Sequence, residues 1–142
     1  MSFTLTHNAY GKSRVLLTKV TRHADRHDLK EISLDIQLEG EFADSFTRGD
    51  NSKVIPTDTM KNTVYALAKN HPLTDLESFG QALARHFMGF PPVAKATIQM
   101  EEHPWQRIGI QGKEHAHAFM VAGNEKRTCQ VINDRQSLRV FA

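Results

Sequence analysis

Residues 32–39 read ISLDIQLE, in which four apolar side chains alternate with four polar ones. Successive side chains of a strand point to opposite faces, so this order puts the apolar set on one face and the polar set on the other. The alternation therefore predicts a β-strand with one buried and one hydrated face, which is typical of an antiparallel sheet covered on one side.

Further strands are predicted on both sides of this segment. Residues 14–21 are rich in Val, Leu and Thr and predict a preceding strand, which a polar turn at residues 23–28 joins to the first. Towards the C-terminus, residues 94–101 repeat the alternation. Gly112 and Gly123 mark turns. We expect the later strands at residues 115–121, 128–132 and 137–141.

Two helices are predicted between these groups of strands. Pro56 ends the extended segment before it, and Thr57 is the expected N-cap of the first helix. A capping box formed by Thr74 and Glu77 begins the second helix, and Gly89 ends it together with two prolines. Apolar residues recur at helical spacing on one side of each helix: Met60, Val64, Leu67 and Ala68 in the first, and Leu76, Phe79, Leu83 and Phe87 in the second.

The order of these elements indicates an α+β fold. Two strands, two helices and then two or more strands fit an antiparallel β-sheet with both helices packed on one face. A length of 142 residues suits one domain with a core of its own. We therefore expect residues 1–142 to form a single domain.

Composition excludes several classes of function. The net charge is +2 and acidic and basic residues are interspersed, so no basic surface for nucleic acid is predicted. No stretch is apolar and long enough to cross a membrane, and the N-terminus lacks the pattern of a secretion signal. The single cysteine, Cys129, excludes an intrachain disulfide and a cysteine-based zinc site, and we expect it to fill space in the core.

The start of the first predicted helix carries a hydroxyl and a carboxylate side by side, at Thr57 and Asp58. A helix start presents free backbone N–H groups, which can bind an anion. The same residues also have an ordinary structural explanation, in which Thr57 caps the helix and Asp58 interacts favourably with its dipole. Periodicity alone leaves both interpretations open.

Several ordered segments of the chain resemble the urate oxidase (uricase) family. The most specific is the stretch at residues 49–65, which contains GDNS, IPTDT and KNTVY. The resemblance extends over essentially the whole chain, because further segments follow in the family's order: YGK at 10–12, LEGEF at 38–42, WQR at 105–107, GK at 112–113, HAHAF at 115–119 and EKR at 125–127.

This resemblance implies a fold and an assembly. A uricase-like chain has two tandem units of the tunnelling fold, a ββααββ unit whose sheets join edge to edge into a barrel with the helices outside. The present chain would be the first of these units, in a homo-oligomer, expected to be a tetramer, with active sites between subunits. Such an enzyme would lie in the cytoplasm of a bacterium or in the peroxisome of a eukaryote.

The resemblance also implies an activity. Urate oxidase converts urate, O2 and water to 5-hydroxyisourate and H2O2 without a cofactor. By the match of motifs, Lys12 corresponds to the catalytic lysine, Thr57 to the threonine that forms a proton-relay dyad with it, and Asp58 to a position that contacts the purine. A lysine can accept a proton when its pKa is lowered, and a nearby hydroxyl can pass that proton to water. Without the resemblance, Lys12 would be a hydrated lysine ahead of a strand.

Two other functions stay open at this level. His115 and His117 are two residues apart on a predicted strand, so both imidazoles share one face, as in a zinc site, and His103 is a candidate third ligand. This arrangement would suit the zinc-dependent pterin enzymes of the same fold. Alternatively, the chain is a non-catalytic purine-binding or assembly module, because the substrate-holding residues of the family's second unit have no counterpart here.

Overall fold

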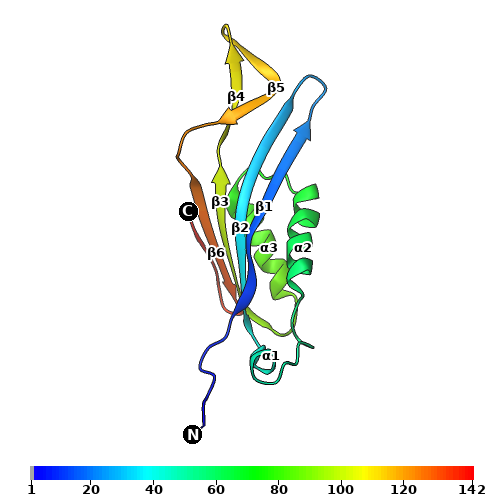
Figure 1. Cartoon of the computed structure of the whole chain (residues 1–142), viewed down its shortest axis with the longest axis vertical. Coiled ribbons are helices and arrows are strands. Elements are labelled where there is room, and N and C mark those ends of the chain that lie inside the picture. Colours follow the sequence, from blue (N-terminus) through cyan, green and yellow to red (C-terminus); the bar gives the residue numbers. More distant parts are fainter. Residues whose placement is uncertain (1) are drawn as a thin grey trace.

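The computed structural model describes residues 2–142 and consists of a β-sheet covered on one face by helices (Figure 1). The larger sheet has five strands in the order β1-β2-β3-β6-β7, and all neighbouring strands are antiparallel. The elements are β1 Tyr10–Arg22, β2 His27–Gly40, α1 Ala43–Thr47, α2 Thr57–Asn70, α3 Leu76–Met88, β3 Val93–His103, β4 Trp105–Ile110, β5 Lys113–Val121, β6 Arg127–Asp134 and β7 Leu138–Phe141.

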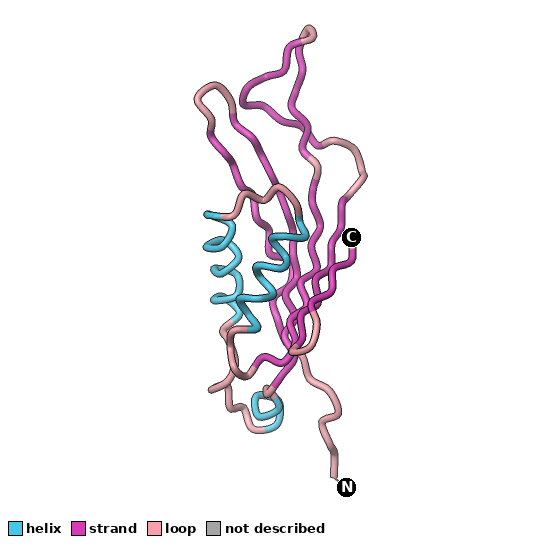
Figure 2. Tube along the Cα trace, turned by 180° about the vertical axis from the view of Figure 1, so that it is seen from behind, coloured by secondary structure: helices cyan, strands magenta, loops and turns pink. Residues whose placement is uncertain are grey.

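Helices α2 and α3 lie on the same side of the large sheet (Figure 2). Helix α2 packs against β1, and α3 packs against β3 and β6. The short α1, which the sequence did not predict, lies beyond the end of β2 (Figure 1). The predicted α+β fold, with both main helices on one face of an antiparallel sheet, is confirmed. In the described chain, no helix has the length and apolarity needed to cross a membrane.

The apolar side chains of residues 32–39 are buried, as their alternation with polar ones predicts. Ile32, Leu34, Ile36 and Leu38 are each at most 2% exposed and belong to the core. Cys129 is 1% exposed in the same core, as expected. Removal of these apolar side chains from water is the main favourable contribution to folding. Helix α3 adds four side chains with no exposed surface, Leu76, Phe79, Leu83 and Phe87.

Both helix starts differ from the expectation. Thr57 is the first helical residue of α2 rather than its N-cap, and Pro56, which has no side-chain acceptor, precedes it. The N-cap of α3 is Asp75 rather than Thr74, because the Asp75 carboxylate accepts a hydrogen bond from the Ser78 N–H at 2.6 Å. This hydrogen bond also holds the pKa of Asp75 below its usual value. The predicted capping box is therefore wrong by one residue.

A hairpin formed by β4 and β5 projects beyond the main sheet (Figure 1). Its turn agrees with the prediction: Gln111 and Gly112 have φ angles of 53° and 75°, the left-handed values of a two-residue hairpin turn. Strand β4 was not predicted, because its sequence WQRIGI does not alternate cleanly. Arg107 ties the hairpin to β2 by donating to His27 O at 2.6 Å and to Asp28 Oδ1 at 2.9 Å.

Candidate functional site

Helix α2 lies beside β1 at the edge of the sheet and runs in the same direction (Figure 1). Three hydrogen-bonded contacts connect β1 to the segment just before α2, to the middle of α2 and to its end. The position of a residue along β1 therefore indicates which part of α2 lies beside it. The contacts, in order, join Tyr10 to Ile55, Leu16 to Tyr65, and Lys19 to Ala68.

Lys19 caps the C-terminal end of α2. Its Nζ donates to Ala68 O at 2.9 Å and also to His71 O. The last carbonyls of a helix have no partner within it, and a positive charge there interacts favourably with the helix dipole. We expect Lys19→Met to lower the free energy of unfolding by about 1–2 kcal/mol, as measured by guanidinium denaturation. Lys69→Met, at an exposed position in the same helix end, is the matched control, and an equal loss in both variants would contradict the capping role.

Lys12 lies on β1 between the contacts made by Tyr10 and Leu16, at the level of the first turns of α2. It pairs with Ile36 of β2, and residues directly opposite each other on neighbouring strands project to the same face. Ile36 is 2% exposed in the core beneath the helices. Lys12 is therefore on the helix-covered face of the sheet, where it is half-buried.

The backbone on both sides of Lys12 is specified by contacts with β2. A Cβ atom on Gly11 would lie 1.7 Å from Ile36 O, so a glycine is required for this close approach. A β-bulge follows Lys12, in which Arg14 has a φ angle of 55° and donates its backbone N–H to Asp35 Oδ1 at 2.6 Å. Bulges re-aim neighbouring side chains and are frequent near functional sites.

Thr57 and Asp58 are the first two residues of α2, and both are exposed. The Asp58 side chain is 80% exposed, and its Oδ1 lies 3.8 Å from Lys61 Nζ in the same turn. The backbone N–H groups at this helix start have no carbonyl partners within the helix. The structure thus places Lys12 at the level of Thr57 and Asp58, although residues 2–142 contain no hydrogen bond from Lys12 to either of them.

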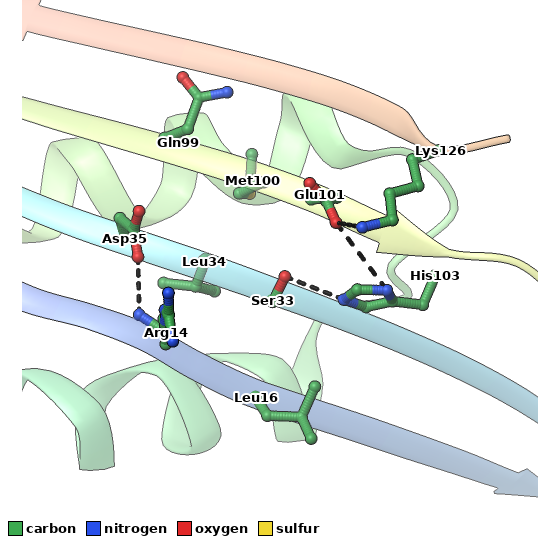
Figure 3. Close-up of a pocket in the computed structure, with 10 residues that line it drawn as sticks. All are labelled: Arg14, Leu16, Ser33, Leu34, Asp35, Gln99, Met100, Glu101, His103 and Lys126. Carbon is green, nitrogen blue, oxygen red and sulfur yellow. Dashed lines mark hydrogen bonds and ion pairs between the residues drawn. The ribbon is translucent and has the colours of Figure 1, made fainter. Parts of the chain in front are cut away.

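A cavity of about 550 Å³ lies on the face of the sheet opposite the helices (Figure 3). Its polar groups largely satisfy one another, since His103 Nε2 is 2.9 Å from Ser33 Oγ and Lys126 forms an ion pair with Glu101. The hydrogen bond from Lys126 lowers the pKa of Glu101. None of the three residues predicted from the family resemblance lines this cavity.

The histidines considered for zinc do not come together. The ring centroids of His115 and His117 are 6.3 Å apart, and His117 packs instead on His27 at 4.3 Å. His115 Nδ1 accepts a hydrogen bond from the His117 N–H, while His103 binds Ser33. Within residues 2–142, no group of three or more His, Cys, Asp or Glu side chains is arranged to hold a metal ion.

Sequence reasoning missed two residues that shape the candidate site. These are Tyr10, which binds Ile55, and Asp35, which binds the bulge at Arg14. Tyr10 carried a signal, because it lies two residues before Lys12 in a family-like segment. Nothing local in the sequence indicates that its partner lies 45 residues away. Asp35 carried no signal beyond its place in the polar half of the alternation.

Comparison with known proteins identifies the family. The Uricase family model matches residues 8–132, so the chain belongs to the uricase family. The chain is 36% identical to the uricase of Oryctolagus cuniculus over 133 residues, which are 93% of this chain and 44% of that protein. It is 39% identical to the uricase of Aspergillus flavus over 127 residues, which are 86% of this chain and 41% of that protein.

The solved structures agree with this assignment. The crystal structure of the uricase from Arthrobacter globiformis matches with a TM-score of 0.90 and 35% identity, over 99% of this chain and 47% of that chain. The chain thus spans less than half the length of these relatives. The uricase resemblance is confirmed, and the α+β fold is consistent with a tunnelling-fold unit. The roles of Lys12, Thr57 and Asp58 stay predictions.

Proposed function

We propose that this chain is the Lys12- and Thr57-bearing half of a urate oxidase, which converts urate, O2 and water to 5-hydroxyisourate and H2O2. The observation that carries the proposal is the position of Lys12 on the helix-covered face of β1. There it lies at the level of the helix start that bears Thr57 and Asp58, in a chain of the uricase family.

The proposed chemistry gives each residue a distinct role. Urate donates two electrons to O2, and loss of a proton makes the urate anion a better reductant. In this scheme Lys12 accepts the proton, and the Thr57 hydroxyl passes it to water. Asp58 contacts the purine, and the free N–H groups of the helix start favour an anionic ligand. The O2 takes up the two electrons and two protons, one from this relay and one from the water that attacks the purine, and leaves as H2O2. The remaining hydroxide of that water becomes the new hydroxyl group on the purine.

This site requires protein surface beyond the present chain. The cleft beside the helix start is lined by residues 52–56 together with Thr59, Phe90 and Pro92, and its volume is about 280 Å³. Lys12, Thr57 and Asp58 do not line it, so the described chain does not enclose these three residues in a pocket of their own. Ligand pockets usually measure roughly 300–1,000 Å³. Strands β1 and β7 are the two edges of the large sheet, and free edges favour pairing with another sheet. We infer a homo-oligomer, a tetramer by family resemblance, in which a neighbouring subunit completes the site for urate and O2.

A complementation assay tests the proposed function. The purified chain is mixed with urate in air, alone and together with the part of the Arthrobacter globiformis uricase that lies outside the match. We expect urate loss with equimolar peroxide in the mixture, and little or none with the chain alone, because the chain spans less than half of the relatives' length. A metal chelator should leave the rate unchanged.

Other outcomes of this assay point elsewhere. Binding of urate without turnover in the mixture would favour a purine-binding or assembly module. Chelator-sensitive turnover of a pterin precursor would favour the zinc enzyme. Absence of both binding and turnover in a correctly assembled mixture would contradict the proposed function.

A further inference from the structure

The phenol of Tyr10 joins β1 to the segment that leads into α2. The Ile55 N–H donates to Tyr10 Oη at 2.8 Å, and the Tyr10 O–H donates to Ile55 O at 3.3 Å. One hydroxyl therefore serves both backbone groups of a residue that is only 6% exposed. Buried backbone groups are ordinarily paired with those of a neighbouring strand. The segment at Ile55 does not continue such a strand, because the next residue, Pro56, has no N–H to donate.

The Tyr10 ring is itself held in place. It packs edge-on against Phe42, with the ring centroids 4.7 Å apart, and Phe42 is 1% exposed. Burial raises the pKa of Tyr10, so the phenol stays protonated and can donate to the carbonyl oxygen at neutral pH. The hydroxyl is thus a fixed point on the sheet rather than the end of a mobile side chain.

The contact between Tyr10 and Ile55 connects the two parts of the candidate site through only a few residues. Lys12 is two residues after Tyr10 on the same face of β1, and Thr57 is two residues after Ile55. The residues in between, Gly11 and Pro56, are both conformationally constrained. Gly11 packs closely against the backbone of β2, and the ring of Pro56 restricts its φ angle.

We propose that Tyr10 is a positioning residue that holds Thr57 and Asp58 at a fixed separation from Lys12. The catalytic and binding roles of Lys12, Thr57 and Asp58 rest on the proposed function. The contact by which Tyr10 fixes the segment before α2 does not. Tyr10→Phe removes the hydroxyl and keeps the ring. The chain offers a matched control in Tyr65, whose O–H donates to Leu16 O at 2.8 Å and also joins α2 to β1, but farther along the helix.

Amide hydrogen exchange of the 142-residue chain tests directly whether Tyr10 fixes the backbone at Ile55. In Tyr10→Phe, exchange of the Ile55 N–H should become about tenfold faster or more, because its acceptor is lost. Exchange of the Met60 N–H, which donates to Pro56 O, should also become faster. Tyr65→Phe should leave the Ile55 N–H unchanged. Unchanged exchange at Ile55 in Tyr10→Phe would overturn the proposal, whether or not the protein oxidises urate.

Kinetics in an assembly that oxidises urate test the positioning. Tyr10→Phe should lower kcat by about tenfold to a hundredfold, the effect of a displacement of about 1 Å, and Tyr65→Phe should leave it within twofold. In a Thr57→Ala background, Tyr10→Phe should lower kcat by a smaller factor than in the wild type, since one of the two groups that it positions is gone. Equal losses in both backgrounds, or equal kcat for the two tyrosine variants, would overturn the proposal. Failure of the wild-type assembly to oxidise urate would instead refute the proposed function.

Discussion

Lys12→Met is expected to lower kcat for urate by about 10²–10⁴-fold in an assembly that oxidises urate, the usual effect of losing a general base. Methionine retains the length and apolar stem of the side chain but cannot accept a proton. Thr57→Ala should lower kcat over the same range. The double variant should lose little more, because residues that act as one unit are not additive. Initial rates of peroxide formation at saturating urate provide the measurement.

A second lysine on the same strand is the control for this experiment. Lys19, like Lys12, is half-buried on β1, and Lys19→Met is expected to lower stability while leaving kcat near that of the wild type. Circular dichroism and the mass of the assembly should be unchanged in Lys12→Met. If correctly assembled Lys12→Met retained kcat within threefold of the wild type, Lys12 would have no place in the proton relay.

Gly11→Ala should destabilise the fold by about 3 kcal/mol, near the upper end of the effects of overpacking. The added Cβ would lie 1.7 Å from Ile36 O and 2.8 Å from Ile36 C, which are backbone atoms of the neighbouring strand. A flexible side chain could move away, but these atoms cannot move without breaking the ladder between β1 and β2. The midpoint of guanidinium denaturation, followed by circular dichroism, measures this loss.

Gly109→Ala is the matched control in another strand. There the added Cβ would meet only Lys113 O, at 3.9 Å, which is an ordinary contact distance. The control is expected to change the free energy of unfolding by less than about 0.5 kcal/mol. Equal midpoints for Gly11→Ala and Gly109→Ala would show that β1 can move away from β2 without cost. That result would also weaken the case that the backbone beside Lys12 is rigid.

The main elements were predictable because their patterns are local. The alternation at residues 32–39 and the helical spacing of Leu76, Phe79 and Leu83 each specify one apolar face, and all three of these helical side chains are fully buried. The less regular parts were not predicted. Strand β4 shows no clean alternation, and α1 is a five-residue helix without a buried side chain.

The N-caps show how local rules can fail by a single residue. Thr74 and Asp75 are adjacent and both can cap, and the choice depends on which side chain faces the Ser78 N–H once α3 has packed. Asp75 does so and Thr74 does not. At α2, Pro56 occupies the N-cap position, so the Thr57 side chain has no capping role and stays exposed at the helix start.

The two parts of the candidate site were visible in the sequence only as separate segments, around Lys12 and around Thr57. Their assignment came from family resemblance, and their relative position came from the fold. The bulge after Lys12 had no local signal, because Arg14 adopts a left-handed φ angle that usually favours glycine. It is stabilised by Asp35, a residue that the alternation marks only as polar and exposed.

The alternating strands and the amphipathic helices follow from the sequence because each depends on neighbours a few residues away and on the exclusion of apolar side chains from water. The proposed positioning of Thr57 relative to Lys12 rests instead on a hydrogen-bonded contact between Tyr10 and Ile55, which are 45 residues apart. The packing of α2 along β1 selects this pair, because it buries the Ile55 backbone where the Tyr10 hydroxyl is within hydrogen-bonding distance.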